Sequence, residues 1–240
     1  MNLRAVSLDR LPGVGFVMIA SVLSLALAGC ESVGGFGSRG GVSPSTEISE
    51  DCAAIQTNVA SLTDVVQRNP NDSQAYNTRG AAYAKCGRYQ EAINDFSSAI
   101  KVDPQNAPAY TNRGLAYQRI GRNDQAQQDF TRAIEANPRH APAYLARANL
   151  LRSQNQLDQA MSDLNQAIRL NPEQAQAFHA RGLIYQRNGD HARAITDFDN
   201  AIDRDPFNAP PYQARGQSLT VVGKYDAAIE DFNAALNINN

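Results

Sequence analysis

The chain has 240 residues, of which 42% are hydrophobic and 19% are charged, and its formal net charge is −2. This is the composition of an ordinary globular protein of one or two domains, without the strong basic excess that nucleic-acid binding requires. With only three histidines and three cysteines in the chain, metal clusters and His-based catalysis are not expected.

The first segment, residues 1–29, is typical of a secretory signal. Two arginines precede an uncharged apolar run that is short for a transmembrane helix and ends in small residues. The run closes with "LAGC" at 27–30, which resembles the lipobox of bacterial lipoproteins. The resemblance implies cleavage before Cys30, lipid on Cys30 and, because Glu31 follows, an outer-membrane anchor facing the periplasm. The alternative is an uncleaved transmembrane anchor.

Two segments separate the signal from the main body of the chain. Residues 30–50 begin with the lipidated Cys30, are rich in Gly and Ser, and show no helical or strand period, so we expect a flexible tether. Residues 51–72 carry Asn69-Pro70 and Leu62 in the register of the repeats described next. They are predicted to form one capping helix, the remnant of a degenerate repeat.

The rest of the chain consists of five copies of a 34-residue repeat. Five prolines, from Pro70 to Pro206, are each 34 residues apart and show this period. The units are 73–106, 107–140, 141–174, 175–208 and 209–240. Position 4 is aromatic, position 8 is Gly or Ala, positions 20 and 27 are Ala, and position 24 is Phe or Leu. Positions 4, 8 and 11 share one face of a first helix, and positions 20, 24, 27 and 28 share one face of a second.

Helix ends are marked in every unit. A Gly, or Asn155 in the third unit, follows the first helix as a C-cap, and a proline stops the second helix in the first four units. These columns resemble the tetratricopeptide repeat (TPR) over residues 73–240. The resemblance implies an all-α, right-handed solenoid of helix-turn-helix repeats, because a single helix pair cannot bury its own apolar face.

A charge pair recurs with the same period, since position 7 is Arg and position 23 is Asp in all five units. A binding site is normally built once, from residues that differ between repeats, so a repeated pair belongs to the scaffold. We predict a partly buried ion pair within each repeat, although the TPR consensus usually has Leu at position 7. The pairs are Arg79–Asp95, Arg113–Asp129, Arg147–Asp163, Arg181–Asp197 and Arg215–Asp231.

The sequence contains no recognisable catalytic pattern. The three histidines are not spaced as metal ligands, no Gly-rich phosphate loop follows a strand, and no Ser or Cys nucleophile has a motif around it. We therefore expect no enzymatic activity, no cofactor and no metal.

The TPR resemblance places a ligand groove on the first helices, at positions 2, 5, 9, 12 and 13. These positions vary between repeats, as a site should, and include a line of basic residues; the alternative is that they are ordinary solvated residues. The candidate groove residues are Asn77, Lys85, Thr111, Leu115, Gln118, Arg119, Leu145, Asn149, Arg152, His179, Leu183, Gln186 and Arg187, with Gln213 and Gln217 in the fifth unit. Ala146 breaks the Lys/Asn/Arg pattern of chaperone-binding TPR domains, which argues against that role.

Two cysteines remain if Cys30 carries lipid. Cys52 begins the expected capping helix and Cys86 ends the next helix, and adjacent antiparallel helices bring such ends together. In an oxidising compartment this even pair is predicted to form a disulfide; the alternative is two inert buried thiols.

The expected function is protein binding in the cell envelope. One hypothesis is an adaptor that brings periplasmic or envelope proteins together, as some outer-membrane TPR lipoproteins do. The second is an assembly factor for an outer-membrane machine, similar to the TPR lipoproteins that help pilus secretins. No polar helix follows the fifth repeat, so the last helix either supports self-association or is solvated by its own Asn233 and Asn237.

Overall fold

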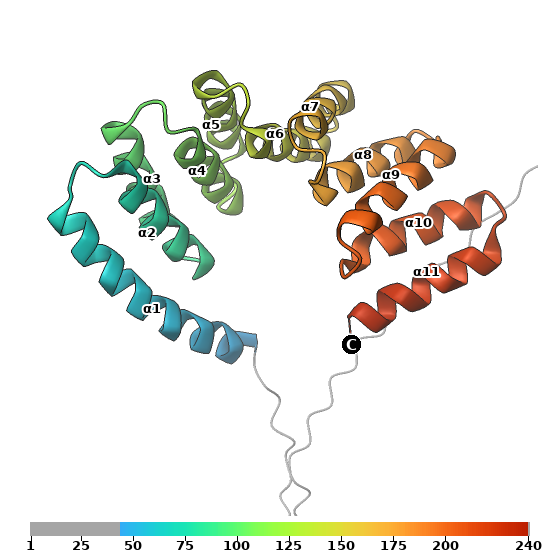
Figure 1. The fold of residues 1–240 in the computed structure, drawn as a ribbon, viewed down its shortest axis with the longest axis horizontal. Helices are drawn as coiled ribbons and strands as arrows, with labels where there is room; N and C mark the ends of the chain where they lie inside the picture. Colours follow the sequence, from blue (N-terminus) through green and yellow to red (C-terminus); the bar gives the residue numbers. More distant parts are fainter. Residues whose placement is uncertain (1–43, 240) are drawn as a thin grey trace, which may run out of the picture. The chain divides into compact units, whose positions relative to one another are not determined.

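The structure is a computed structural model that describes residues 44–239; the signal, Cys30 and the first part of the tether lie outside this range. All described elements are α-helices, which confirms the all-α solenoid (Figure 1). α1 spans Pro44–Arg68 and is followed by five helix pairs. The pairs are α2 Ser73–Lys85 with α3 Tyr89–Val102, α4 Ala107–Arg119 with α5 Asn123–Ala136, α6 Ala141–Ser153 with α7 Leu157–Leu170, α8 Ala175–Arg187 with α9 His191–Arg204, and α10 Ala209–Val221 with α11 Tyr225–Ile238.

The first helix is longer than the sequence indicated. α1 begins at Pro44, inside the segment expected to be a flexible tether, rather than at Asp51. Proline is favoured in the first turn of a helix, where its missing N–H has no partner to lose. This local signal extends the helix although no apolar period is visible there.

The turn between the two helices of each repeat depends on a left-handed residue. Four glycines occupy that position with φ between 71° and 78°, and Asn155 replaces them in the third repeat with φ 63°. Asparagine is among the few side-chain-bearing residues that tolerate this conformation, so the predicted substitution is confirmed. At the other end of the repeat, Asp103 is extended before Pro104, which stops α3.

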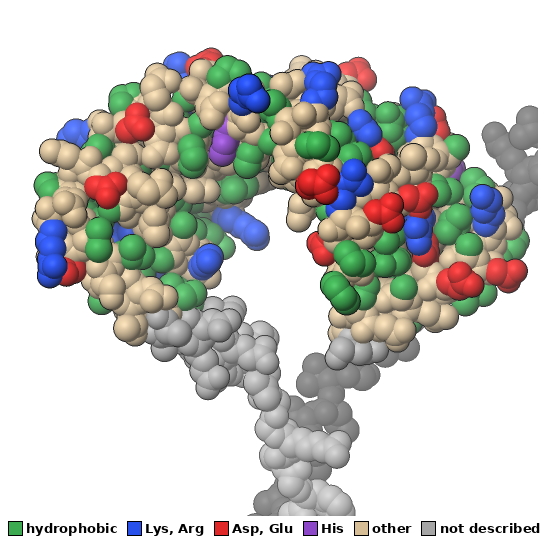
Figure 2. Space-filling model, viewed as in Figure 1, with side chains coloured by type: hydrophobic (Ala, Val, Ile, Leu, Met, Phe, Trp, Pro, Cys, Tyr) green, Lys and Arg blue, Asp and Glu red, His purple; other side chains and the backbone are tan. Residues whose placement is uncertain are grey.

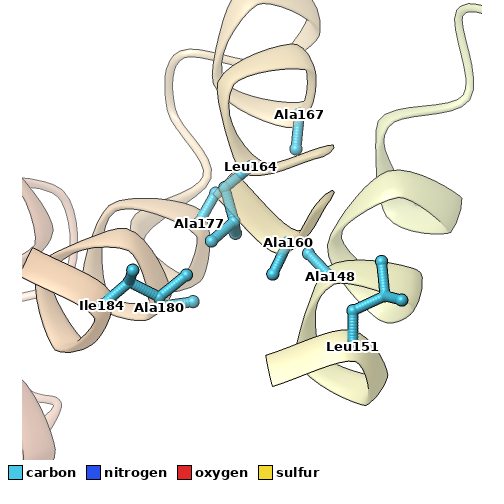
Figure 3. Close-up of a cluster of buried hydrophobic side chains, with 8 residues drawn as sticks. All are labelled: Ala148, Leu151, Ala160, Leu164, Ala167, Ala177, Ala180 and Ile184. Atoms are coloured by element: carbon cyan, nitrogen blue, oxygen red, sulfur yellow. The ribbon is translucent and has the colours of Figure 1, made fainter. Parts of the chain in front are cut away.

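The helices of a repeat lie very close together at position 8. A Cβ added to Gly114 would lie 2.6 Å from Phe130 Cε1, and Gly80, Gly182 and Gly216 face their own phenylalanines in the same way. The third repeat has Ala148 at position 8 and the smaller Leu164 at position 24, and both belong to one cluster of buried aliphatic residues (Figure 3). The small residue at position 8 and the large residue at position 24 are therefore one packing unit.

All five predicted ion pairs are present. In each, the arginine Nε and Nη2 donate to the two carboxylate oxygens of the aspartate at distances of 2.6–2.9 Å. The aspartates are buried and the arginines are partly buried. Hydrogen bonding to the aspartate raises the pKa of the arginine, for example that of Arg113. The pair thus joins the two helices of each repeat through a bidentate, charge-assisted contact.

Each arginine makes a third contact that the sequence did not indicate. Its Nη1 donates to a side chain sixteen residues earlier, on the last helix of the preceding repeat or on α1. The acceptors are Thr63 (3.3 Å), Ser97 (3.0 Å), Thr131 (3.2 Å), Asn165 (2.7 Å) and Asp199 (2.6 Å). The arginines therefore form a ladder that ties every repeat to the one before it.

Within residues 44–239, no helix is long and apolar enough to cross a membrane.

Candidate functional site: an inner groove across α2, α4 and α6

The first helices of the repeats form one side of the stack. Each first helix from α2 to α8 contacts the next one along the chain, up to α10, whereas no such contact joins the described second helices to one another. In the N-terminal half of the stack, α2, α4 and α6 lie on the inner side and α3, α5 and α7 on the outer side (Figure 1). Side chains that leave the first helices away from their partners therefore face the inner side, as the TPR resemblance implied.

A first hollow opens on this inner side between α2 and α4 and has a volume of about 440 Å³. Its floor is apolar, with Ala81 and Ala84 on α2, Leu115 on α4, and the rings of Tyr89 and Phe96 beneath them. Leu115 is an exposed large aliphatic residue, which is unusual for a helix that packs on both neighbours. The hollow can therefore accept an apolar side chain of a ligand.

A second hollow of about 340 Å³ continues the first between α4 and α6. The two share Leu115 and Asn112, so they form one groove across three repeats. Pro108, Pro142 and Leu145 supply its apolar lining, and Asn149 adds an amide. Together, the amides of Asn112 and Asn149 can hydrogen-bond an extended backbone while the aliphatic residues hold its side chains.

The groove is electrically asymmetric. Lys85 and Arg119 are exposed and line its first hollow (Figure 2 shows Lys and Arg side chains at the inner edge of the stack). His140 lines the second hollow, and burial lowers its pKa, which favours the neutral ring at pH 7. One end of the groove thus carries two positive charges and the other is neutral, which gives a bound segment a preferred direction.

Several predicted groove residues hold the repeats together instead. Asn77 and Thr111 are buried; Asn77 Oδ1 accepts a hydrogen bond from Asn112 Nδ2 at 3.0 Å, and Thr111 Oγ1 donates to the Ala107 carbonyl. Gln186 Nε2 donates to the Ala214 carbonyl and to Ser218 Oγ, both at 2.9 Å. Asn77 and Gln186 thus bond to the next first helix, which corrects their assignment as freely accessible ligand contacts, whereas Thr111, bonded within its own helix, lines the second hollow.

Arg152 and His179 form a separate, half-buried pair. Burial, and secondly the positive charge of Arg152, lower the pKa of His179 to about 4. The His179 ring lies 5.9 Å from the Phe198 ring, and Leu183 packs against the same buried cluster. Arg152 Nε is buried without a hydrogen-bond partner among the described residues. Arg152 is therefore not part of an exposed basic line.

Two further basic or polar candidates lie elsewhere on the first helices. Gln118 is half-buried, and Arg187 is exposed but does not line either hollow. The predicted line of basic residues is thus reduced to Lys85 and Arg119 in the groove itself.

Sequence reasoning missed the central residue of the groove. Asn112 lines both hollows but stands at position 6, which was used only for comparison with chaperone-binding domains. Its neighbour at position 5, Thr111, was chosen and lines only the second hollow. The available signal was the helical period, because Asn112 lies three residues before Leu115 and therefore on the same face.

The predicted Cys52–Cys86 disulfide is not present in this structure. Both residues are half-buried, Cys52 on α1 and Cys86 just after the end of α2. α1 packs against α2, as the prediction required. The disulfide stays a prediction about the protein in an oxidising compartment. Among residues 44–239, no group of three or more His, Cys, Asp or Glu side chains is placed to hold a metal ion.

Family models match the chain along its repeats. The model described as "TPR repeat" matches residues 80–121 and 148–189. Models described as "Tetratricopeptide repeat" match residues 62–94, 107–140, 130–161, 175–208 and 209–240. No curated protein sequence matches the chain.

Solved structures show the same architecture. A crystal structure of MamA is 26% identical, with a TM-score of 0.58 over 67% of this chain and 94% of MamA. YrrB, described as a TPR protein with an unusual peptide-binding site, is 20% identical, with a TM-score of 0.56 over 74% of this chain and 91% of YrrB. PilF of Pseudomonas aeruginosa is 20% identical, with a TM-score of 0.66 over 71% of this chain and 78% of PilF. The family-model matches run together from residue 62 to residue 240, and the chain belongs to the tetratricopeptide repeat family.

Proposed function

We propose that this protein is a lipid-anchored adaptor of the bacterial cell envelope that binds an extended segment of a partner protein in the groove of α2, α4 and α6. TPR proteins generally mediate protein–protein interactions and are typically non-catalytic. The observation that carries the proposal is the continuity of the two hollows, with an apolar floor around Leu115 and a basic end at Lys85 and Arg119.

The chemistry of the groove defines the class of ligand. Apolar side chains of the segment occupy the spaces over Leu115 and Leu145, and an acidic residue lies beside Lys85 and Arg119. Burial of the apolar side chains supplies affinity, and the charges set the association rate and the direction of the segment. An aliphatic segment with one acidic end therefore binds better than a basic or uniformly polar one.

The anchor rests on the sequence. Lipid on Cys30 places the protein in the outer membrane facing the periplasm, and the segment up to α1 lets the repeats stand off the membrane. Replacing Cys30 by Ser removes the acylation site. Incorporation of a palmitate analogue and sedimentation with the membrane fraction should both be lost in Cys30→Ser; an unchanged membrane association would support a transmembrane anchor instead.

The groove is tested by reversing its charge. Partners are captured by cross-linking from envelope extracts with wild type and with Lys85→Glu combined with Arg119→Glu. Both residues are exposed, so the fold should be preserved. A matched control, Lys101→Glu with Arg132→Glu, makes the same charge change on α3 and α5, on the other side of the stack.

The expected result is loss of capture by the groove variant and retention by the control. Equal capture by the groove variant, with loss in the control, would move the binding site to the outer side. Soluble partners support the adaptor; a single integral outer-membrane protein as the captured species would instead support an assembly factor for an outer-membrane machine.

A further inference from the structure

The last helix of the stack exposes a stripe of large apolar side chains. Tyr225, Ile229, Phe232 and Leu236 recur every three or four residues and therefore share one face of α11. They are 63%, 57%, 37% and 60% exposed, respectively. Among the described residues, α11 packs against α10 alone. A stripe of this kind on one helix marks an interaction surface rather than scattered surface residues.

The other repeats show what covers this face. The residues equivalent to Phe232 are Phe96, Phe130, Leu164 and Phe198, and none is more than 1% exposed. In each case the first helix of the next repeat lies on the second helix that carries them, as in the pairs α3 with α4 and α7 with α8. The face of α11 is thus a fifth copy of an interface that the protein builds four times.

The helix that covers such a face has a recognisable pattern. On α8, the small side chains of Ala177 and Ala180, followed by Ile184, pack into the cluster that contains Leu164 of α7 (Figure 3). These residues lie at i, i+3 and i+7. Small side chains allow the two helix axes to approach closely, and the third residue closes the contact.

The arginine ladder requires, in addition, an arginine on the covering helix four residues after the first small residue, at i+4. Arg181 follows Ala180 and donates from Nη1 to Asn165 Oδ1 of α7 at 2.7 Å. On α11 the residue equivalent to Asn165 is Asn233, and it is exposed. Asp226 and Glu230 are exposed on the same flank of α11 as Asn233 and add negative charge. The open face therefore offers an amide acceptor and a negative field where an arginine is needed.

We propose that the open face of α11 is a docking site for an amphipathic helix of a partner protein, with small or aliphatic side chains at i, i+3 and i+7 and an arginine at i+4. The first helices of this chain within residues 44–239 are already engaged with their own neighbours, so none of them covers this face. This site is distinct from the groove and does not depend on the proposed function of the groove.

The experiment uses the mature chain and a labelled synthetic peptide with the sequence of residues 174–189, which contains α8. The peptide supplies the required pattern, and its natural partner α7 carries Asn165 where α11 carries Asn233. Binding is followed by fluorescence anisotropy, and the oligomeric state of the chain at the same concentrations by analytical ultracentrifugation. The variants are Leu236→Asp, Ile229→Asp and Asn233→Leu, with Lys85→Glu as a control in the groove.

We expect saturable binding that weakens at least about tenfold in Leu236→Asp and Ile229→Asp, since each loses the burial of an aliphatic side chain. Asn233→Leu should weaken the wild-type peptide but not a peptide with Arg181→Met, and Lys85→Glu should have no effect. Absence of binding, or binding that Leu236→Asp leaves intact, would overturn the proposal. So would a chain that is dimeric through α11 and excludes the peptide, because a second copy would then be the natural occupant.

Discussion

At the scale of single residues, the recurring arginine decides how the repeats hold together. Each arginine places a charge in a partly buried site and satisfies it with both oxygens of an aspartate and with one acceptor from the preceding unit. A half-satisfied version of this arrangement would leave a charge desolvated without compensation, which is far more costly than replacing the whole pair by apolar residues. Removing one partner is therefore the informative change.

The first prediction concerns Asp129. Replacing it by Ala leaves the Arg113 guanidinium without its main acceptor and should lower the free energy of unfolding by about 3 kcal/mol. Arg113→Leu combined with Asp129→Leu should recover part of that loss. Urea unfolding of the three proteins measures both effects, and Glu135→Ala, which breaks an exposed pair with Arg132, serves as control. If Asp129→Ala costs no more than Glu135→Ala, the repeated pair adds nothing to stability.

The second prediction concerns the pH dependence of stability. His179 has its pKa lowered from 6.5 to about 4 in the folded protein, chiefly by burial. Between these values the unfolded chain binds a proton that the folded chain does not, so stability is complete above pH 6.5 and falls as the pH drops towards 4. Because the ring is only partly buried, we expect a loss of about 2 kcal/mol over this window.

His179→Phe removes the titrating group and should flatten the stability profile over the same window. Unfolding of both proteins is compared at pH 7 and at pH 4.5, and the His179 ring is titrated directly by NMR in the folded protein. A profile for His179→Phe that remains as steep as that of wild type would assign the acid sensitivity to other groups, of which His140 is the first candidate because burial also lowers its pKa.

At the scale of helices, the sequence predicts ends better than beginnings. Glycine or asparagine after each first helix and proline after the second helices of the first four repeats are steric signals, and the turns follow them. The early start of α1 at Pro44 depends on weaker preferences, which the Gly/Ser-rich composition around it masks. The third contact of each arginine could not be predicted from the sequence either. Its acceptors are Thr, Ser, Asn or Asp, so no single residue type marks this position in every repeat.

The third prediction concerns the packing unit of positions 8 and 24. Alanine is normally better than glycine in a helix by up to about 1 kcal/mol. In Gly114→Ala, however, the new Cβ would lie 2.6 Å from Phe130 Cε1, and overpacking costs about 1–3 kcal/mol. We therefore expect a net loss in thermal stability.

The natural pair Ala148 and Leu164 provides the matched comparison. Combining Gly114→Ala with Phe130→Leu reproduces that pair in the second repeat. The double variant should be more stable than the sum of the two single changes, because the smaller side chain makes room for the new methyl group. Strict additivity in a double-mutant cycle would mean that the two positions do not constrain each other.

The fourth prediction concerns the attachment of α1. A disulfide between Cys52 and Cys86 in the mature protein would close a loop between α1 and the end of α2 and stabilise the chain by about 3–4 kcal/mol on the loop-entropy estimate. If the protein is exported to an oxidising compartment as proposed, thiol labelling of denatured, non-reduced protein should find neither cysteine reactive. Two labelled cysteines per chain would rule the bond out, and reduction of the sample provides the positive control.

At the scale of the whole molecule, the sequence predicts the solenoid fold, but it predicts only part of the candidate groove. The 34-residue period specifies the solenoid, because each repeat contacts only its neighbours. Assigning the groove needed contacts between neighbouring first helices, which a repeat alignment does not show. Position 5 is Asn77 in the first repeat, where it accepts a hydrogen bond from Asn112, and Leu145 in the third repeat, where it lines the second hollow.

The fifth prediction concerns local stability along the stack. A repeat with neighbours on both sides gains two interfaces, whereas the pair α10 and α11 has one described neighbour. Amide hydrogen exchange should therefore be slowest in α6 and α7 and fastest in α11, whose apolar face is exposed. Uniform protection along all repeats would indicate that the stack unfolds as a single cooperative unit.

The arginine ladder also bears on how such a protein can change in length. Every repeat presents an acceptor sixteen residues before the arginine of the next, so removing residues 107–140 would bring Ser97 to that distance from Arg147. Ser97 and Thr131 are both hydroxyl acceptors, so the new junction would resemble the old ones. Duplication or loss of a whole unit by unequal recombination therefore keeps the hydrogen bond at each junction between repeats and changes only the length of the inner surface.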